Sequence, residues 1–159
     1  MITQERLIEL LRYNSCTGDF VRIKQISNAH PCGGKVGSYS EGYLRISIDG
    51  KSYLAHRLAW LYMTGKWPEN EIDHININRR DNRWCNLRRA THGQNQQNQK
   101  GWGASGIKGV HWRACDSKWC ARIGTNGRKF LGYFHTKEAA HAAYVEAAKR
   151  LHGEFARAE

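Results

Sequence analysis

The sequence has no uninterrupted apolar run close to the ~18 residues that a membrane-spanning helix needs. Its first six residues lack the apolar core of a signal peptide. Acidic residues are scarce as well, since 14 Asp and Glu stand against 25 Lys and Arg, for a formal net charge of +11. These absences argue against a membrane protein, and we expect a cytoplasmic protein with no membrane partner.

Paired cysteines are also missing. The chain has five cysteines, an odd number, and none of them forms a C-x-x-C pair. Zinc sites are usually built from such pairs, so we expect no zinc. The simpler interpretation is a set of buried free thiols in a reducing compartment. The five are Cys16, Cys32, Cys85, Cys115 and Cys120.

The positive charge is spread along the chain: residues 1–99 hold 14 basic and 9 acidic side chains, and residues 100–159 hold 11 and 5. Such an excess favours a polyanion as partner, because Lys and Arg on phosphates release condensed counterions. A basic protein that is merely soluble is the alternative. Both halves of the chain are therefore candidates for contact with nucleic acid.

Three regions differ in pattern, at residues 1–52, 53–100 and 101–159. The first predicts an amphipathic helix from Thr3, strands at 20–23, 43–48 and 52–55, and a hairpin turn at Asp49-Gly50. The second predicts a helix from Arg57 to Met63 that ends at Gly65. A glycine-rich stretch, 101–106, is a plausible linker. The role of residues 1–52 stays open.

The third region predicts three strands and a helix. The strands are expected at 107–113, 118–124 and 128–134, with turns at Asp116-Ser117 and Asn126-Gly127. Thr136 suits the helix N-cap and Gly153 the residue after its end. Strand alternation puts Cys120 on a polar face and Trp112 on the face that packs against the helix. The other members expected on these faces are His111, Arg113, Lys118 and Arg122, and Trp119, Ala121 and Ile123.

The residues with the clearest chemical potential lie in the second region. Asp73 precedes His74, and Asn86 and Asn95 follow at intervals of thirteen and nine residues. Carboxylate and amide oxygens suit a hard divalent cation, and histidine is the usual general base near neutral pH. Together, the carboxylate, the imidazole and the two amides could hydrolyse a phosphodiester. A polar loop on a basic domain, with Asp and Asn as turn formers, is the alternative.

Residues 43–99 resemble the HNH nuclease family in the ββα-metal (His-Me finger) arrangement of phage and intron-encoded homing endonucleases. The resemblance rests on residues 55–57, 72–76, 81–83, 86–88 and 94–98. It implies His74 and Asn86 as catalytic residues, with His74 the general base and Asn86 bracing the loop between two strands. It also implies Asp73 and Asn95 as ligands of one Mg²⁺ or Mn²⁺. Asn95 stands where the family more often has His.

Basic residues around this segment are expected to contact phosphate rather than only solvent. They are Arg79, Arg80, Arg83, Arg88 and Arg89. His56 favours a structural role at the start of its helix, with a place near the phosphate as the alternative.

The third region resembles the Apetala/ethylene-response-factor DNA-binding domain, on residues 106–111, 118–119, 130–134 and 136–140. A three-stranded sheet of this kind can enter the major groove. A module for protein contacts is the alternative. The resemblance implies DNA contacts at Lys108, His111, Arg113, Arg122, Arg128 and Phe130. Since His111 and Phe130 differ from the family's residues, its sequence preference does not transfer.

The predicted fold class is α+β: an HNH ββα-metal core plus a small three-stranded antiparallel sheet with one packed helix. The predicted function is a metal-dependent endonuclease on double-stranded DNA, in the host bacterium's cytoplasm if a phage encodes it. A monomer that nicks is favoured, because no dimer-forming heptad is present, and a dimer stays open. The alternatives are a DNA-binding regulator that no longer cuts and a binder of RNA.

Overall fold

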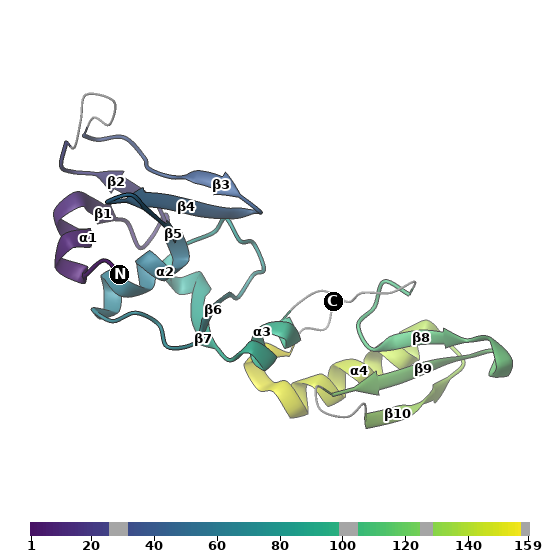
Figure 1. The fold of residues 1–159 in the computed structure, drawn as a ribbon. Coiled ribbons are helices and arrows are strands. Elements are labelled where there is room, and N and C mark those ends of the chain that lie inside the picture. The colour runs from purple at the N-terminus through teal and green to yellow at the C-terminus, as the bar shows by residue number, and fades with distance from the viewer. Residues whose placement is uncertain (26–31, 99–104, 125–128, 157–159) are drawn as a thin grey trace. The chain divides into compact units, whose positions relative to one another are not determined.

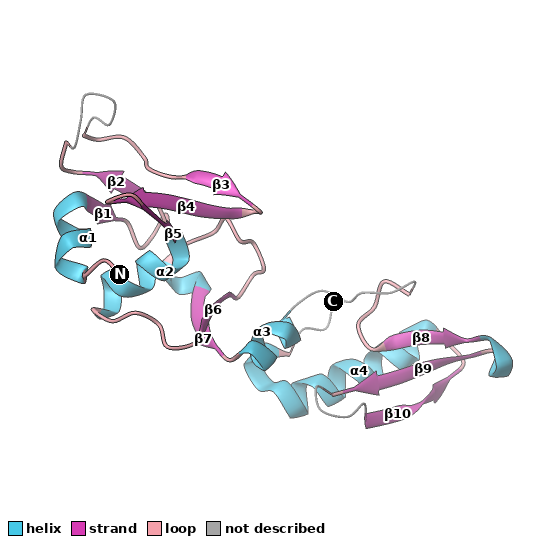
Figure 2. Ribbon diagram, in the orientation of Figure 1, coloured by secondary structure: helices cyan, strands magenta, loops and turns pink. Residues whose placement is uncertain are grey.

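The computed structural model describes residues 1–25, 32–98, 105–124 and 129–156. Within these ranges the chain is a mixed α+β protein with four α-helices and short antiparallel sheets, as the sequence predicts (Figures 1 and 2). It divides into two compact units, Met1–Ala90 and Thr91–Glu159. In the described part, none of the helices combines the length and apolar character that a membrane span requires.

The first unit joins two helices to three small antiparallel sheets, which pair β1 with β2, β3 with β4 and β5, and β6 with β7. Its elements are α1 (Gln4–Leu10), β1 (Leu11–Tyr13), β2 (Phe20–Arg22), β3 (Ser38–Ser40), β4 (Tyr43–Ile48), β5 (Lys51–Leu54), α2 (Ala55–Thr64), β6 (Glu71–His74), the 3₁₀ turn η1 (Trp84–Asn86) and β7 (Leu87–Ala90).

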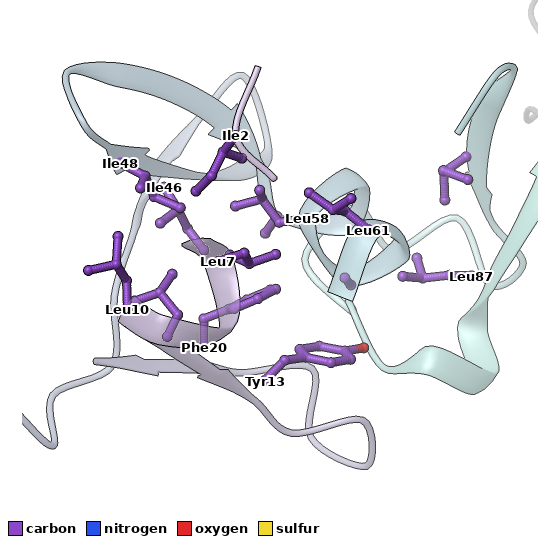
Figure 3. Packing of buried hydrophobic residues seen from close by; sticks show 14 residues of the cluster. Ile2, Leu7, Leu10, Tyr13, Phe20, Ile46, Ile48, Leu58, Leu61 and Leu87 are labelled. Carbon is purple, nitrogen blue, oxygen red and sulfur yellow. The ribbon is translucent and has the colours of Figure 1, made fainter. Parts of the chain in front are cut away.

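One hydrophobic core holds this unit together, and both sides of residue 52 contribute to it (Figure 3). Leu7 and Leu10 on one face of α1, Phe20 on β2, Ile46 on β4 and Leu58 on α2 are each at most 1% exposed. Burying a side chain of this size contributes about 1.5–3 kcal/mol. The N-terminal region and the helix α2 therefore form one core.

Local sequence signals fix the ends of these elements. The Thr3 hydroxyl accepts from the Arg6 amide and caps α1, and Gly65 in the left-handed region ends α2. Asp49 and Gly50 have φ values of 49° and 76°, so the two-residue turn between β4 and β5 is of the type that matches strand twist.

The hairpin of β6 and β7 carries most of the predicted site. Asp73 pairs with Arg88 and His74 with Leu87 in the antiparallel register. The two strands are joined by residues 75–86, which end in η1. The C-terminal end of β6 thus places two neighbouring polar side chains beside a long connecting loop.

The second unit contains the sheet order β10–β9–β8, with α4 packed on one face. Its elements are α3 (His92–Asn98), β8 (Val110–Arg113), η2 (Ala114–Asp116), β9 (Lys118–Ile123), β10 (Lys129–Phe134), α4 (Lys137–His152) and η3 (Gly153–Phe155). Gly109, at φ 71°, lets the backbone lie against the Tyr144 ring of α4, because a Cβ there would meet that ring at 2.4 Å. Thr136 and Gly153 bound α4 as predicted.

Several predictions need correction. Cys120 is fully buried rather than on a polar surface, because it lies on the central strand with His111 and Tyr133 opposite it. Trp112 packs on Trp119 but is 49% exposed, since it lies near the end of β8. The prediction of buried thiols holds for Cys120 alone, and the other four cysteines are exposed.

Two short strands, β1 and β3, are not predicted by the sequence, and β8 starts later than expected, at Val110. A strand of three residues has too little alternation to be recognised. The Asn126-Gly127 turn, Arg128 and residues 101–104 of the linker lie outside the described residues.

Candidate active site

Asp73 and His74 lie at the end of β6 and are both buried, at 5% exposure each. Adjacent residues of a strand point to opposite faces, so the two side chains have different surroundings. Asp73 faces Arg88 of β7, whereas His74 faces the connecting loop and the start of α2. The site therefore combines a paired carboxylate with a desolvated imidazole.

Asn86 holds the connecting loop in shape. Its Oδ1 accepts from the Asn76 amide at 3.0 Å, and its Nδ2 donates to Asn76 Oδ1 at 2.9 Å and to the Asp81 carbonyl at 2.8 Å. Its backbone carbonyl accepts from the Ile75 amide at 2.9 Å. The side-chain Oδ1 and Nδ2 and the backbone carbonyl of Asn86 thus all bond within one loop. Such bonds hold the loop backbone in a fixed conformation.

The His74 imidazole has contacts with Asn82, His56 and Tyr43. Asn82 places Oδ1 3.3 Å from its Nε2, the His56 ring meets it edge to face with centroids 5.0 Å apart, and the Tyr43 ring lies at 6.2 Å. Burial lowers the pKa of His74, with the bond to Asn82 and the charge of Asp73 opposing that shift. A neutral imidazole is the form that can accept a proton.

His56 lies at the start of α2, where the sequence expects it, and is 6% exposed. Burial, followed by the charge of His74 and of Arg57, lowers the pKa of His56 to about 3. Its ring also packs on Tyr43 at 5.4 Å. It is therefore a neutral packing partner of His74, which agrees with the structural role that the sequence favours.

Asp73 makes an ion pair with Arg88. The Arg88 Nε donates to Asp73 Oδ2 at 2.9 Å, and the two side chains are 13% and 5% exposed. One of the five arginines predicted to contact phosphate thus bonds to the predicted metal ligand. A carboxylate accepts several bonds at once, so this ion pair and a cation are chemically compatible.

The predicted donor set for a metal is one carboxylate and one amide, both hard oxygen donors. Mg²⁺ keeps several waters and is often held by one or two carboxylates, so this set fits it. Asn95 lies on α3 in the second unit, one turn after Thr91. Thr91 caps this helix: its hydroxyl accepts from the Gln94 amide, and its own amide donates to the Gln94 side chain. The pairing of Asp73 with Asn95 stays a prediction. Among the residues described, no group of three or more His, Cys, Asp or Glu side chains lies close enough together to hold a metal ion.

The other arginines of the site differ in their surroundings. Arg79 and Arg80 are exposed, and their guanidinium groups lie over the rings of Tyr43 and Tyr39, 4.8 and 4.6 Å from the centroids. Arg83 makes two bonds to the Asp81 carboxylate, at 2.8 and 2.6 Å. Arg89 is exposed, 3.8 Å from Glu69. Arg79 and Arg80 thus stack on tyrosine rings, whereas Arg83 and Arg89 lie beside carboxylates.

The bond from Arg83 lowers the pKa of Asp81 to about 2. Because the folded pKa lies below the usual value near 4, this carboxylate stabilises the fold above that value, and the contribution is lost as the pH falls towards 2. We expect Asp81→Asn to lower the free energy of unfolding by about 1 kcal/mol at neutral pH. The variant should also show a shallower loss of stability between pH 4 and pH 2.

Urea unfolding at a series of pH values measures this difference. Glu69→Gln is the matched control, since it removes a carboxylate that is 86% exposed. Stability curves of wild type and Asp81→Asn that run parallel through the acid range would show that Asp81 does not stabilise the loop.

In the second unit, the residues predicted to contact DNA lie on or beside one sheet. His111, Arg113 and Phe130 are exposed, Arg122 is partly buried, and Arg122 pairs with Phe130 in the register. Arg113 bonds to Asp116 and stacks on Tyr133. Lys108 instead donates to the carbonyls of Gln96 and Gln97 at the end of α3. Arg128 lies outside the described residues.

Sequence reasoning missed three residues of the site: Tyr39, Tyr43 and Asn82. The two tyrosines come from the region before residue 52, whose role the sequence left open, and no spacing rule connects them to Arg80 or His74. Asn82 stands next to Asp81 in a segment that resembles the family, so the resemblance identified its position but not its bond to the imidazole.

Comparison with known proteins identifies one family. Residues 53–97 match the family model described as HNH endonuclease, a span that runs from β5 through α3. No curated protein and no solved structure shows a significant match to the chain. The match supports a nuclease of the HNH type, a class that acts on DNA and generally uses a divalent metal ion.

Proposed function

We propose that this protein is a metal-dependent endodeoxyribonuclease of the phage or homing type, which hydrolyses one phosphodiester bond per binding event. The observation that carries the proposal is the desolvated His74, hydrogen-bonded at Nε2 and adjacent to a buried carboxylate, inside the residues that match the HNH model. A single centre of this kind breaks one strand. We therefore propose a monomer that nicks DNA.

His74 is the general base of the proposed reaction. It takes a proton from water, the water oxygen forms a bond to phosphorus, and the bond from phosphorus to the leaving oxygen breaks while that oxygen takes up a proton from solvent. Asn86 keeps the loop in place, so that the imidazole stays where the phosphate binds. Mg²⁺ or Mn²⁺, held by Asp73 and Asn95, would stabilise the negative charge that develops on the phosphate oxygens.

Arg79 and Arg80 are proposed to bind phosphates of the DNA backbone near the scissile bond. Stacking on Tyr43 and Tyr39 limits the rotamers of both side chains before DNA binds. A guanidinium group held in this way loses less entropy when it bonds a phosphate.

Arg79→Ala and Arg80→Ala should each lower the salt dependence of DNA affinity by roughly one unit of slope. Fluorescence anisotropy with a labelled duplex at several salt concentrations measures the slope. Arg12→Ala, which removes an exposed arginine of β1, should leave the slope unchanged. Slopes equal to wild type in both variants would remove these residues from the DNA interface.

The second unit is proposed to add sequence preference, through the exposed face of β8, β9 and β10. This face carries His111, Arg122 and Phe130, and arginine on a guanine edge is the commonest specific contact in the major groove. Arg122→Ala should therefore weaken binding to the preferred site by about 1–3 kcal/mol, and binding to random duplex much less.

A selection from random duplexes identifies the preferred site, and anisotropy with that site and a scrambled one then gives the ratio of affinities. Lys149→Ala on α4, an exposed basic residue away from the sheet, is the control. An unchanged ratio in Arg122→Ala would assign the preference to another surface.

A second candidate function is DNA binding without cleavage. The observation that favours it is the ion pair of Arg88 with Asp73, since a carboxylate already paired with a cation is a poorer metal ligand. Incubating supercoiled plasmid with the protein and Mg²⁺ or Mn²⁺ separates the two functions. Nicked circles that form with the metal and not with EDTA support the nuclease, whereas mobility shifts without nicking support the regulator.

A further inference from the structure

Tyr13, a residue of the N-terminal region, makes a buried bond to the loop beside His74. Its hydroxyl donates to the carbonyl of Asn82 at 2.6 Å, across 69 positions of sequence. Tyr13 is 6% exposed and belongs to the same core as Phe20 and Leu58. Figure 3 shows its ring turned from β1 towards the loop, with the hydroxyl oxygen at its far end. The core of the first unit thus reaches the segment next to the predicted general base.

The same segment is held at two more points. The Trp84 amide donates to the Ser15 carbonyl at 3.0 Å, and Gly18 lies directly against the backbone of Asn82 and Arg83. A Cβ at Gly18 would meet the Asn82 carbonyl carbon at 2.5 Å, and the residue has a φ of 78°. Only glycine permits both that approach and that φ without strain. The turn between β1 and β2 therefore fixes the backbone of Asn82.

The Asn82 side chain passes this constraint on to His74. Asn82 is 2% exposed, and its Nδ2 donates to the Arg80 carbonyl at 3.3 Å. This bond fixes the orientation of the amide: Nδ2 points to the Arg80 carbonyl, because only the amide nitrogen can donate to a carbonyl. Oδ1 is then the atom that faces the imidazole, 3.3 Å from Nε2.

The orientation of that amide determines where the imidazole carries its proton. An amide oxygen can only accept a hydrogen bond, so Nε2 must be the protonated nitrogen. In a neutral imidazole Nδ1 then holds the lone pair, and a general base acts through that lone pair. The ring contacts with His56 and Tyr43 hold the plane of the imidazole but do not distinguish its two nitrogens.

We propose that Asn82 and Tyr13 are positioning residues, which hold His74 as the Nε2–H tautomer and so present Nδ1 to the attacking water. The N-terminal region is on this account part of the catalytic apparatus. The role of Nδ1 in catalysis rests on the proposed nuclease function, whereas the tautomer itself is a property of the free protein.

The tautomer is tested directly by NMR on the ¹⁵N-labelled full chain without DNA. Long-range ¹H–¹⁵N correlations at slightly alkaline pH distinguish protonated from unprotonated ring nitrogens, and His74→Gln assigns the signal among the eight histidines. We expect wild-type His74 to be protonated at Nε2. In Asn82→Ala the two tautomers should mix, and in Asn82→Asp, which keeps an acceptor, Nε2–H should persist. An Nδ1–H tautomer in wild type, or no change in Asn82→Ala, would overturn the proposal.

Cleavage kinetics test whether the positioning matters. Asn82→Ala should lower kcat by about 10- to 100-fold, with KM within about twofold, since misplacement by about 1 Å costs up to about 100-fold. Tyr13→Phe, which removes one hydroxyl from an otherwise unchanged core, should lower kcat by about two- to tenfold. Asn82→Asp should recover most of the loss in Asn82→Ala.

Tyr53→Phe is the matched control, because Tyr53 packs on Trp67 in the same core without contacting Asn82. It should keep the wild-type kcat. If Tyr13→Phe and Tyr53→Phe lose kcat equally, or if Asn82→Asp fails to recover activity, the two residues support the fold only. A wild-type protein with the Nε2–H tautomer and no nuclease activity would contradict the proposed function and leave the tautomer assignment standing.

Discussion

Replacing His74 by alanine is expected to lower kcat for DNA cleavage by about 100- to 10,000-fold and to leave DNA affinity within about twofold. A general base contributes on that order, because the reaction must otherwise proceed from undissociated water. Affinity should persist because His74 is 5% exposed, whereas the exposed Arg79 and Arg80 are the proposed backbone contacts. Single-turnover nicking of a supercoiled plasmid measures the rate, and anisotropy measures the affinity.

His135→Ala is the matched control, since it removes an exposed imidazole from the loop before α4. It should cut at the wild-type rate. His74→Ala must also unfold at a similar urea midpoint, so that loss of the fold does not account for loss of cleavage. A folded His74→Ala protein that nicks within about tenfold of the wild-type rate would show that His74 is not the base.

Replacing Asp73 by asparagine is expected to lower cleavage by about 1,000-fold at low metal concentration. This corresponds to about 4 kcal/mol of charge stabilisation lost in the transition state. The substitution keeps the shape of the side chain and an oxygen that can accept from Arg88, so the hairpin of β6 and β7 should remain folded. It removes the charged donor of the proposed metal site, and part of the rate should return as Mg²⁺ or Mn²⁺ is raised.

Isothermal titration with Mn²⁺ and nicking rates across a metal series measure both effects together. Asp49→Asn, which removes an exposed carboxylate from the turn between β4 and β5, is the control and should bind metal and cut as wild type does. An Asp73→Asn protein with wild-type metal dependence would place the metal on other residues.

Much of the fold follows from local patterns in the sequence. Strand β4 begins and ends where alternation predicts, and Gly65, Thr136 and Gly153 bound their helices. Such signals, a helix cap or a glycine in the left-handed region, depend only on residues that are neighbours in sequence. The short strands β1 and β3 depend on partners brought by the fold, and no local signal marks them.

The site was predictable to the extent that its chemistry lies in one segment. Asp73, His74 and Asn86 stand in order along the hairpin, so their spacing and the family resemblance were enough to select them. The bond of Tyr13 to Asn82 joins residues 69 positions apart, and the bond of Asn82 to His74 joins residues eight positions apart in an irregular loop, so no spacing rule encodes either. Cys120 shows the same limit, since burial on a central strand is decided by the neighbouring strands.

The arginines of the site differ in ways that the charge pattern does not show. Five arginines in one stretch are predicted to contact phosphate, which stays a prediction; in the structure Arg88 bonds to Asp73 and Arg83 to Asp81. The pair of Arg88 with Asp73 could not be found by looking for acidic residues near Arg88 in the sequence, because Asp73 lies opposite it on the other strand of the hairpin. Arg79 and Arg80 lie over the rings of Tyr43 and Tyr39, and these aromatic partners come from the N-terminal region.

The most direct test of a metal-dependent nuclease with His74 as its base compares wild type and His74→Ala on supercoiled plasmid, each with Mg²⁺ and with EDTA. The account predicts nicked circles in one of the four reactions only, wild type with Mg²⁺. Nicking by wild type in EDTA, or by His74→Ala at a comparable rate with Mg²⁺, would contradict it.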